Sequence, residues 1–169
     1  MLEQVGWAFG AILNALANPL IAGGVVVGGG ALGLGGWFAA RRFWWRPVPS
    51  VLAGISLGIV LGVTFSRALP DWAGQEFCHL NGFSLYGSAE LLNALLFVPL
   101  VFFAVLATRR PLAVLGSAVA LSAVIEIVQP LTRRGLCETQ DFFNNSAGAA
   151  VAALVAAGVL ALERSAVAR

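Results

Sequence analysis

Apolar residues fill this chain in long continuous runs, which short stretches containing Arg, Pro or Gly interrupt. A helix needs about 20 apolar residues to cross the hydrocarbon core of a membrane, and five runs approach or reach that length. They cover residues 20–40, 50–69, 91–107, 111–128 and 142–162. Continuous runs predict helices rather than the short alternating strands of a membrane barrel. The pattern therefore predicts an all-α fold, a polytopic transmembrane helical bundle of five spans, with residues 1–169 forming a single membrane domain.

The composition supports this class. Hydrophobic residues make up 59% of the 169 residues and charged residues 11%, and the mean hydropathy is +0.88. This leaves too little polar surface to cover a soluble globule. Residues 1–18 contain Trp7 and Phe9 and few charges, so we expect an interfacial helix there rather than an extension of the first span. A cleaved signal peptide is not expected, since no arginine precedes Arg41.

The basic residues, all ten of them arginine, predict the orientation of the bundle. Cytoplasmic loops carry an excess of Lys and Arg. If the first span enters from outside, seven arginines face the cytoplasm and three face outward. The first group is Arg41, Arg42, Arg46, Arg109, Arg110, Arg164 and Arg169, and the second is Arg67, Arg133 and Arg134. We therefore predict an outer amino terminus and a cytoplasmic carboxyl terminus. The aromatic and basic segment 37–46 is interpreted as an interfacial anchor, and a net charge of +2 gives no indication of a nucleic-acid partner.

Glycines recur at four-residue spacing in the first span, as Gly24 with Gly28 and Gly29 with Gly33. Such pairs allow two helix backbones to approach closely. We expect them to pack against a neighbouring helix of the same chain rather than to form a dimer interface.

The two cysteines, Cys78 and Cys137, fall in the two predicted outer loops. An even number of cysteines on an oxidising side predicts a disulfide between those loops. The alternative is a metal site that uses both cysteines and His79, but this set lacks a fourth ligand and any Cys-x-x-Cys spacing. Neither a metal site nor a cofactor is therefore predicted.

Polar residues gather at the outer ends of the last three predicted spans. Helical spacing places them on shared faces: Glu90, Asn93 and Phe97 in the third span, Glu126 and Gln129 in the fourth, Asp141, Asn145 and Gly148 in the fifth. Arg133 and Arg134 lie in the loop between the last two spans. Polar groups at membrane depth usually mark a functional site, so we predict one here. The structural alternative is that Asp141 only caps its helix and Glu126 only pairs with an arginine.

These residues resemble the VanZ-like family, named for a teicoplanin-resistance protein. The resemblance covers about residues 90–158 and is carried by the order and spacing of Glu90, Asn93, Phe97, Pro99, Leu100, Glu126, Gln129, Arg134, Asp141, Asn145 and Gly148. We take Arg134, rather than Arg133, as the motif arginine. The resemblance implies a multi-pass protein of the bacterial cytoplasmic membrane, associated with reduced susceptibility to glycopeptide-type antibiotics. It does not imply a reaction.

Three hypotheses for the site remain open. The first is recognition of an anionic cell-envelope lipid or lipid-linked cell-wall precursor. In that hypothesis Arg133 and Arg134 hold its phosphate or carboxylate. Asn93, Gln129 and Asn145 then bind its hydroxyl or amide groups, Glu126 and Asp141 orient the arginines, and Glu90 belongs to the same site. The second is a membrane enzyme with Glu126 or Asp141 as general base; a divalent ion on Glu90, Glu126 and Asp141 would favour it. The third is a structural protein of envelope assembly. Transport is disfavoured because no inverted repeat is evident.

Overall fold

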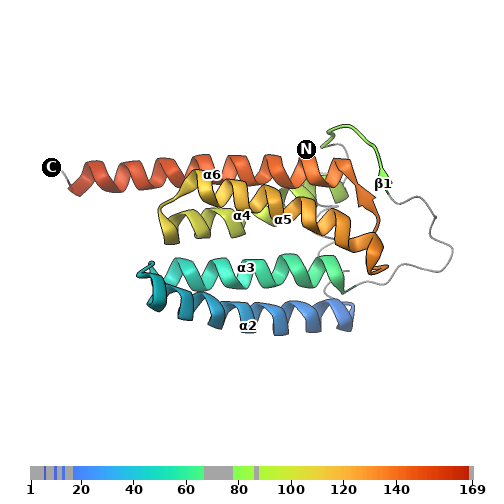
Figure 1. Cartoon of the computed structure of the whole chain (residues 1–169), viewed down its shortest axis with the longest axis horizontal. Helices are drawn as coiled ribbons and strands as arrows, with labels where there is room; N and C mark the ends of the chain where they lie inside the picture. Colours follow the sequence, from blue (N-terminus) through green and yellow to red (C-terminus); the bar gives the residue numbers. More distant parts are fainter. Residues whose placement is uncertain are drawn as a thin grey trace.

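The computed structural model describes residues 6, 10, 13, 17–66, 78–85 and 88–167. Long helices make up most of this part of the chain (Figure 1). They are α2 (Pro19–Phe43), α3 (Pro47–Phe65), α4 (Ser88–Thr108), α5 (Pro111–Leu131) and α6 (Thr139–Val167). All five are long and apolar enough to cross a membrane, which confirms the predicted all-α membrane bundle. The interfacial helix predicted within residues 1–18 lies largely outside the described residues.

Local sequence sets where the helices begin. Pro19, Pro47 and Pro111 each stand at the start of a helix, where the missing amide hydrogen has no intrahelical partner to lose. The Asn18 side chain caps α2 by accepting a hydrogen bond from the Leu20 amide at 3.0 Å. At the other end of α2, Trp44 adopts a left-handed conformation, with φ of 57°, that stops the helix.

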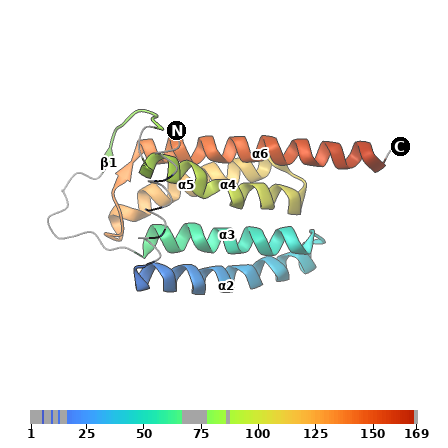
Figure 2. The same ribbon diagram turned by 180° about the vertical axis from the view of Figure 1, so that it is seen from behind.

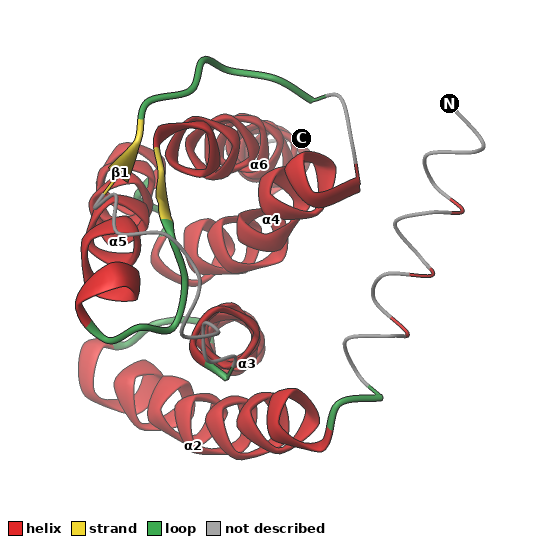
Figure 3. Ribbon diagram, turned by 90° about the vertical axis from the view of Figure 1, so that its right-hand side faces the viewer, coloured by secondary structure: helices red, strands yellow, loops and turns green. Residues whose placement is uncertain are grey.

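The helices run alternately up and down, in two groups (Figures 1 and 2). Helix α2 packs on α3, α3 packs on α4, and α4 and α5 both pack on α6. Figure 3, which views the bundle from one end, shows α3 lying between α2 and the group of α4, α5 and α6. The fully buried core side chains come from α3, α4 and α6, and include Val60, Phe97, Val101, Val105, Ala149 and Ala156. The candidate site therefore belongs to a group of three helices, and α2 lies on the far side of α3 from it.

Glycine determines how closely α2 and α3 approach. A Cβ atom added to Gly58 would overlap the backbone of Gly28 and Gly29, and one added to Gly28 would lie 3.2 Å from the Gly58 carbonyl oxygen. Gly24 and Gly33 also face residues at or within α3. The prediction that these glycines pack against a helix of the same chain is confirmed.

The two ends of the bundle differ in chemistry. One end holds the short α2–α3 and α4–α5 connections and the carboxyl end of α6 (Figure 1). Six of the arginines predicted to be cytoplasmic lie there, and Arg169 is outside the described residues. At this end Arg46 forms a salt bridge with Glu163 at 3.1 Å, and the Arg41 guanidinium lies 4.0 Å from the centre of the Trp37 ring. The opposite end carries the two short strands, Arg133 and Arg134, and the polar residues of the predicted site.

Candidate functional site

Two short strands cover the end of the bundle that carries the polar residues. Strand β1 (Cys78–His79) pairs in parallel with β2 (Cys137–Glu138), so that Cys78 stands opposite Cys137 and His79 opposite Glu138. A disulfide joins Cys78 to Cys137, as predicted. Because it uses both thiols, the alternative metal site of Cys78, His79 and Cys137 is excluded. We call this pair of strands with its disulfide the cap.

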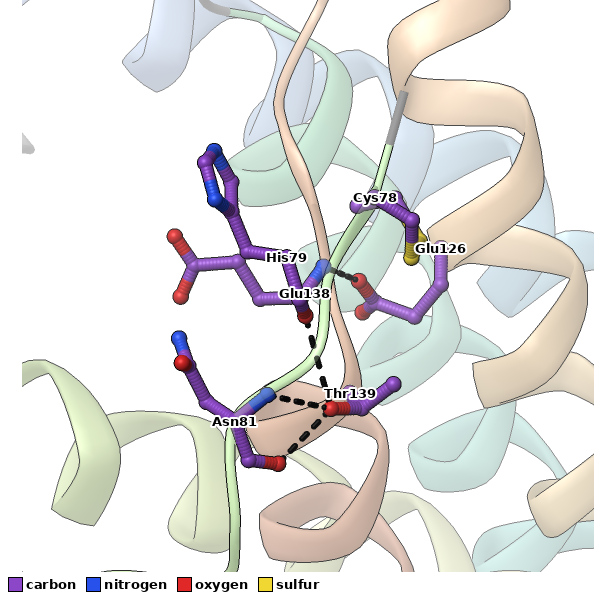
Figure 4. Close-up of a disulfide and its surroundings, with 7 residues drawn as sticks. Cys78, His79, Asn81, Glu126, Glu138 and Thr139 are labelled. Carbon is purple, nitrogen blue, oxygen red and sulfur yellow. Dashed lines mark hydrogen bonds between the residues drawn. A yellow bond between two sulfur atoms is a disulfide. The ribbon is translucent and has the colours of Figure 1, made fainter. Parts of the chain in front are cut away.

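Thr139, the first residue of α6, fixes the segment that follows β1. Its hydroxyl accepts a hydrogen bond from the Asn81 amide at 2.8 Å and donates to the Asn81 carbonyl oxygen at 2.7 Å (Figure 4). One side chain thus satisfies both backbone groups of Asn81. Hydrogen bonds thus hold the segment after β1 to the start of α6, in addition to the disulfide that joins β1 to β2.

Glu126 connects the cap to α5. Its side chain is only 6% exposed, and its Oε2 atom accepts a hydrogen bond from the Glu138 amide at 2.9 Å. In Figure 4 its carboxylate points at the strand pair, beside the disulfide. Glu126 therefore holds the backbone of β2 at the end of α5. The predicted role of orienting an arginine stays a prediction.

We expect Glu126→Gln to retain the cap and Glu126→Leu to loosen it. The glutamine amide oxygen can accept the same hydrogen bond, so the loss of stability should stay near 1 kcal/mol, whereas leucine leaves the Glu138 amide without an acceptor, at a cost of about 1–3 kcal/mol. Thermal unfolding in lipid nanodiscs measures the difference. Equal stability of the two variants would contradict this role of the carboxylate.

Helices α4 and α6 meet beside Glu126. The Asn93 side chain of α4 is hydrogen-bonded to Asp141 in the first turn of α6, and the Glu90 carboxylate acts electrostatically on the same residue. The close contact is possible because Gly148, two turns further along α6, has no side chain: a Cβ there would overlap the Ala94 carbonyl oxygen. This agrees with the prediction that Gly148 admits a neighbouring helix.

The carboxylates converge from different elements. Glu126 of α5 is acted on by Asp141 and Glu138, and Asp141 is acted on by Glu138 and Glu90. Asp141 also lies in the first turn of α6, where the amino-terminal end of the helix dipole favours a negative charge. The structure thus brings together Glu90, Asn93, Glu126 and Asp141, as the sequence predicted. Glu138 joins them, and the sequence analysis did not include it in the site.

Buried amide side chains lie one helical turn deeper. Asn145 of α6 is 5% exposed and donates a hydrogen bond from Nδ2 to the Ser122 Oγ of α5 at 3.1 Å. Its Oδ1 atom has no hydrogen-bond partner, and both polar atoms of the fully buried Asn144 have none either. Buried polar atoms are nearly always paired. Each of these three atoms therefore needs a hydrogen-bond partner that the described residues do not supply.

Asn144 and Ser122 were missed by the sequence analysis although both carry a readable signal. Asn144 stands four residues before Gly148, and Ser122 four residues before Glu126, so each shares a helix face with a residue that was chosen. In the sequence Asn144 looks like any asparagine near the start of a helix. Only its complete burial, which the structure shows, sets it apart.

The predicted arginines lie in the turn between α5 and β2, and Gln129 lies in the last turn of α5. Arg133 has a φ of 55°, and both arginine side chains are exposed. The Arg134 amide donates to the Gln129 carbonyl oxygen at 2.9 Å, while the Gln129 side chain lies against Gly135. The arginines are thus exposed at the same end of the bundle as the candidate site. Within the described part of the chain, no group of three or more His, Cys, Asp or Glu residues could hold a metal ion.

Fold and geometry together define a polytopic helical membrane protein with a buried polar cluster beneath a disulfide-linked cap. Residues 57–161, well over half of the chain, match the family model described as VanZ/LLP1. The chain therefore belongs to the VanZ/LLP1 family, in agreement with the resemblance found in residues 90–158. The match begins in α3, earlier than that region. No curated protein and no solved structure matches this chain.

Proposed function

We propose that this VanZ/LLP1 protein binds an anionic cell-envelope lipid, or a lipid-linked cell-wall precursor, at the capped end of its bundle. Binding there would influence susceptibility to glycopeptide-type antibiotics. The observation that carries the proposal is the set of unpaired polar atoms on the buried residues Asn144 and Asn145, in the half of α6 that starts at the end of the bundle with the exposed Arg133 and Arg134. Polar groups of a bound amphiphile would satisfy those atoms.

Each part of such an amphiphile has a matching surface. The guanidinium of Arg134 can hold a phosphate or carboxylate through two parallel hydrogen bonds. Asn93 and Asn145 offer amides to neutral groups of the head, and the apolar faces of the helices border the lipid tails. Leu95 of α4 and Val124 of α5, both about half exposed, are examples of such apolar side chains.

The orientation in the bacterial cytoplasmic membrane is part of the proposal, with the amino terminus outside and the carboxyl terminus in the cytoplasm. Two observations support it. The end opposite the cap carries most of the described arginines, which favour the cytoplasm. The Cys78–Cys137 disulfide belongs in an oxidising compartment. The capped end then lies at the outer leaflet, where envelope lipids and glycopeptides meet.

Arg134→Ala should remove the bound lipid. Loss of a charge-assisted hydrogen-bond pair costs about 1.5–3 kcal/mol, so the amount of anionic lipid retained through purification should fall about tenfold or more. Mass spectrometry of the protein purified in native lipid measures it, and glycopeptide susceptibility of cells should change with it.

The matched control is Arg110→Ala, which removes an exposed arginine at the opposite end. It should leave both lipid retention and susceptibility unchanged. If Arg134→Ala and Arg110→Ala retain the same lipid in the same amount, the proposed function is wrong. Should both keep normal abundance and unchanged susceptibility, a structural role would replace it.

A further inference from the structure

Six arginines form a basic surface at the end of the bundle opposite the cap. They are Arg41, Arg42, Arg46, Arg109, Arg110 and Arg164, and we call their surface the arginine end. Five of the six side chains are exposed, and Arg46 is partly buried and forms a salt bridge with Glu163 at 3.1 Å. Glu163 is the only acidic residue among the described residues of this end. Six positive charges against one negative charge leave it strongly positive.

A backbone hydrogen bond joins the two turns that carry most of these arginines. The Arg46 amide, at the end of the α2–α3 turn, donates to the Ala107 carbonyl oxygen near the end of α4 at 3.3 Å. Arg109 and Arg110 follow directly after α4, and the salt bridge from Arg46 to Glu163 holds α6 to the same place. Segment 37–46, interpreted above as an interfacial anchor, is therefore one part of a larger surface to which the α4–α5 turn and α6 contribute.

Helix dipoles account for some of these arginines and oppose others. A cation is favourable at the carboxyl end of a helix and unfavourable at its amino end. Arg41, Arg42 and Arg164 stand in the last turns of α2 and α6. Arg46 and Arg110 are instead the N-cap residues of α3 and α5, which have no acidic residue in the first turn, whereas both helices that begin at the capped end have one. Helix stability alone therefore does not explain the arginine end.

Aromatic side chains beside the arginines indicate the depth of this surface. Trp44 is 94% exposed, Phe43 stacks on Trp45 with 5.2 Å between the ring centres, and the Arg41 guanidinium lies over the Trp37 ring. Tryptophan concentrates where the lipid headgroups meet the hydrocarbon core. The arginines next to these rings then lie at the level of the lipid phosphates.

We propose that the arginine end binds anionic phospholipids in preference to neutral ones, in the leaflet that this end meets. The partner is a lipid whose phosphate has no ammonium group to balance it, such as phosphatidylglycerol. Each exposed guanidinium can hold phosphate oxygens through charge-assisted hydrogen bonds, and each arginine near an anionic surface adds to the attraction. Aromatic rings alone would anchor the bundle without regard to the charge of the lipid. This surface is separate from the capped end and does not depend on the function proposed there.

The test measures which lipid lies against Trp44. The full chain is placed in nanodiscs that contain equal amounts of phosphatidylglycerol and phosphatidylcholine, with bromine on the acyl chains of one lipid or of the other, and the quenching of tryptophan fluorescence is compared. The difference between the natural protein and Trp44→Phe isolates the signal of Trp44. We expect phosphatidylglycerol to be enriched around Trp44 by about fivefold, the contribution of a single arginine near an anionic surface.

Two double variants locate the charge that selects the lipid. Arg42→Gln with Arg109→Gln removes two exposed charges from the arginine end and should lower the enrichment to about twofold or less. Arg133→Gln with Arg134→Gln removes the same number of charges from the capped end and should leave the enrichment unchanged. Salt at about 1 M, where the screening length is about 3 Å, should remove most of the enrichment in the natural protein. This last measurement decides the question if the first double variant does not fold.

Contrary results overturn the proposal in different ways. Equal quenching by the two labelled lipids in the natural protein would show that the arginine end does not select by charge. Enrichment that persists in high salt and in the Arg42 and Arg109 variant would assign the selection to apolar contacts. Loss of enrichment in the Arg133 and Arg134 variant would assign it to the net charge of the whole chain. Lipids at the arginine end exchange with the bilayer, so these results are independent of the lipid retained through purification at the capped end.

Discussion

Gly148→Ala should destabilise the bundle by about 2–3 kcal/mol, the upper part of the range for overpacking a well-packed interior. The added methyl group would overlap the carbonyl oxygen of Ala94. That obstacle is backbone, so no rotamer change and no truncation of the Ala94 side chain relieves it. Helices α4 and α6 must move apart, and the contact between Asn93 and Asp141 should be lost with them. Thermal unfolding in nanodiscs should show the loss, together with reduced lipid retention.

The control for this variant is the same substitution ten residues further along the same helix. A Cβ on Gly158 would meet nothing within 4 Å, and alanine is the better helix former by about 0.5–1 kcal/mol. Gly158→Ala should therefore be neutral or slightly stabilising. Identical unfolding temperatures for the two variants would show that α4 and α6 do not touch at Gly148.

Replacing both cysteines, as Cys78→Ala with Cys137→Ala, should cost about 2–4 kcal/mol, the typical value for a native disulfide. The two cysteines are 59 positions apart in the sequence. The spanning helices stay formed even when the bundle comes apart, because lipid cannot pair with their backbone groups, so the unfolded chain has less freedom for the crosslink to restrict. We therefore expect a loss at the lower end of this range, about 2 kcal/mol, and concentrated in the cap. Hydrogen exchange should become faster at the amides of Glu138 and Asn81, which donate to Glu126 and Thr139.

Reduction of the natural protein provides an independent version of the same experiment. A reducing agent should accelerate exchange at the same two amides and have no effect on the double variant. Amides in the middle of α4 should exchange at the same rate throughout. Unchanged exchange at Glu138 after reduction would mean that Glu126 and the β pairing hold the cap without the disulfide.

Sequence patterns predicted the helices well because hydrocarbon imposes one solution on a long apolar run. Backbone groups in lipid must be paired within the segment, so runs such as 91–107 and 111–128 have no alternative to helix. The predicted disulfide was confirmed for a related reason. The alternating direction of the spans places Cys78 and Cys137 at the same end of the bundle, and the chain has no other cysteine with which either could pair.

Less could be predicted about the candidate site. Glu90, Asn93, Glu126 and Asp141 were identified because polar residues are rare in such a chain and helical spacing groups them. Their partners were not identifiable. The Glu126 carboxylate was expected to pair with an arginine or orient one, whereas its observed hydrogen bond goes to the Glu138 amide. A backbone donor has no signature in a sequence.

The sequence by itself determined the class of this protein, its five spans, the alternation that brings three polar helix ends to one level, and its family. The class and the spans follow from transfer free energies that each residue carries independently of its neighbours, and the family follows from the order and spacing of the polar residues. Only the tertiary structure decided that Gly148 lies on Ala94, that Asn145 donates to Ser122, and that Asn144 is buried with its amide unpaired. Such contacts depend on the rotation and depth of one helix against another, which side-chain packing of the whole bundle sets.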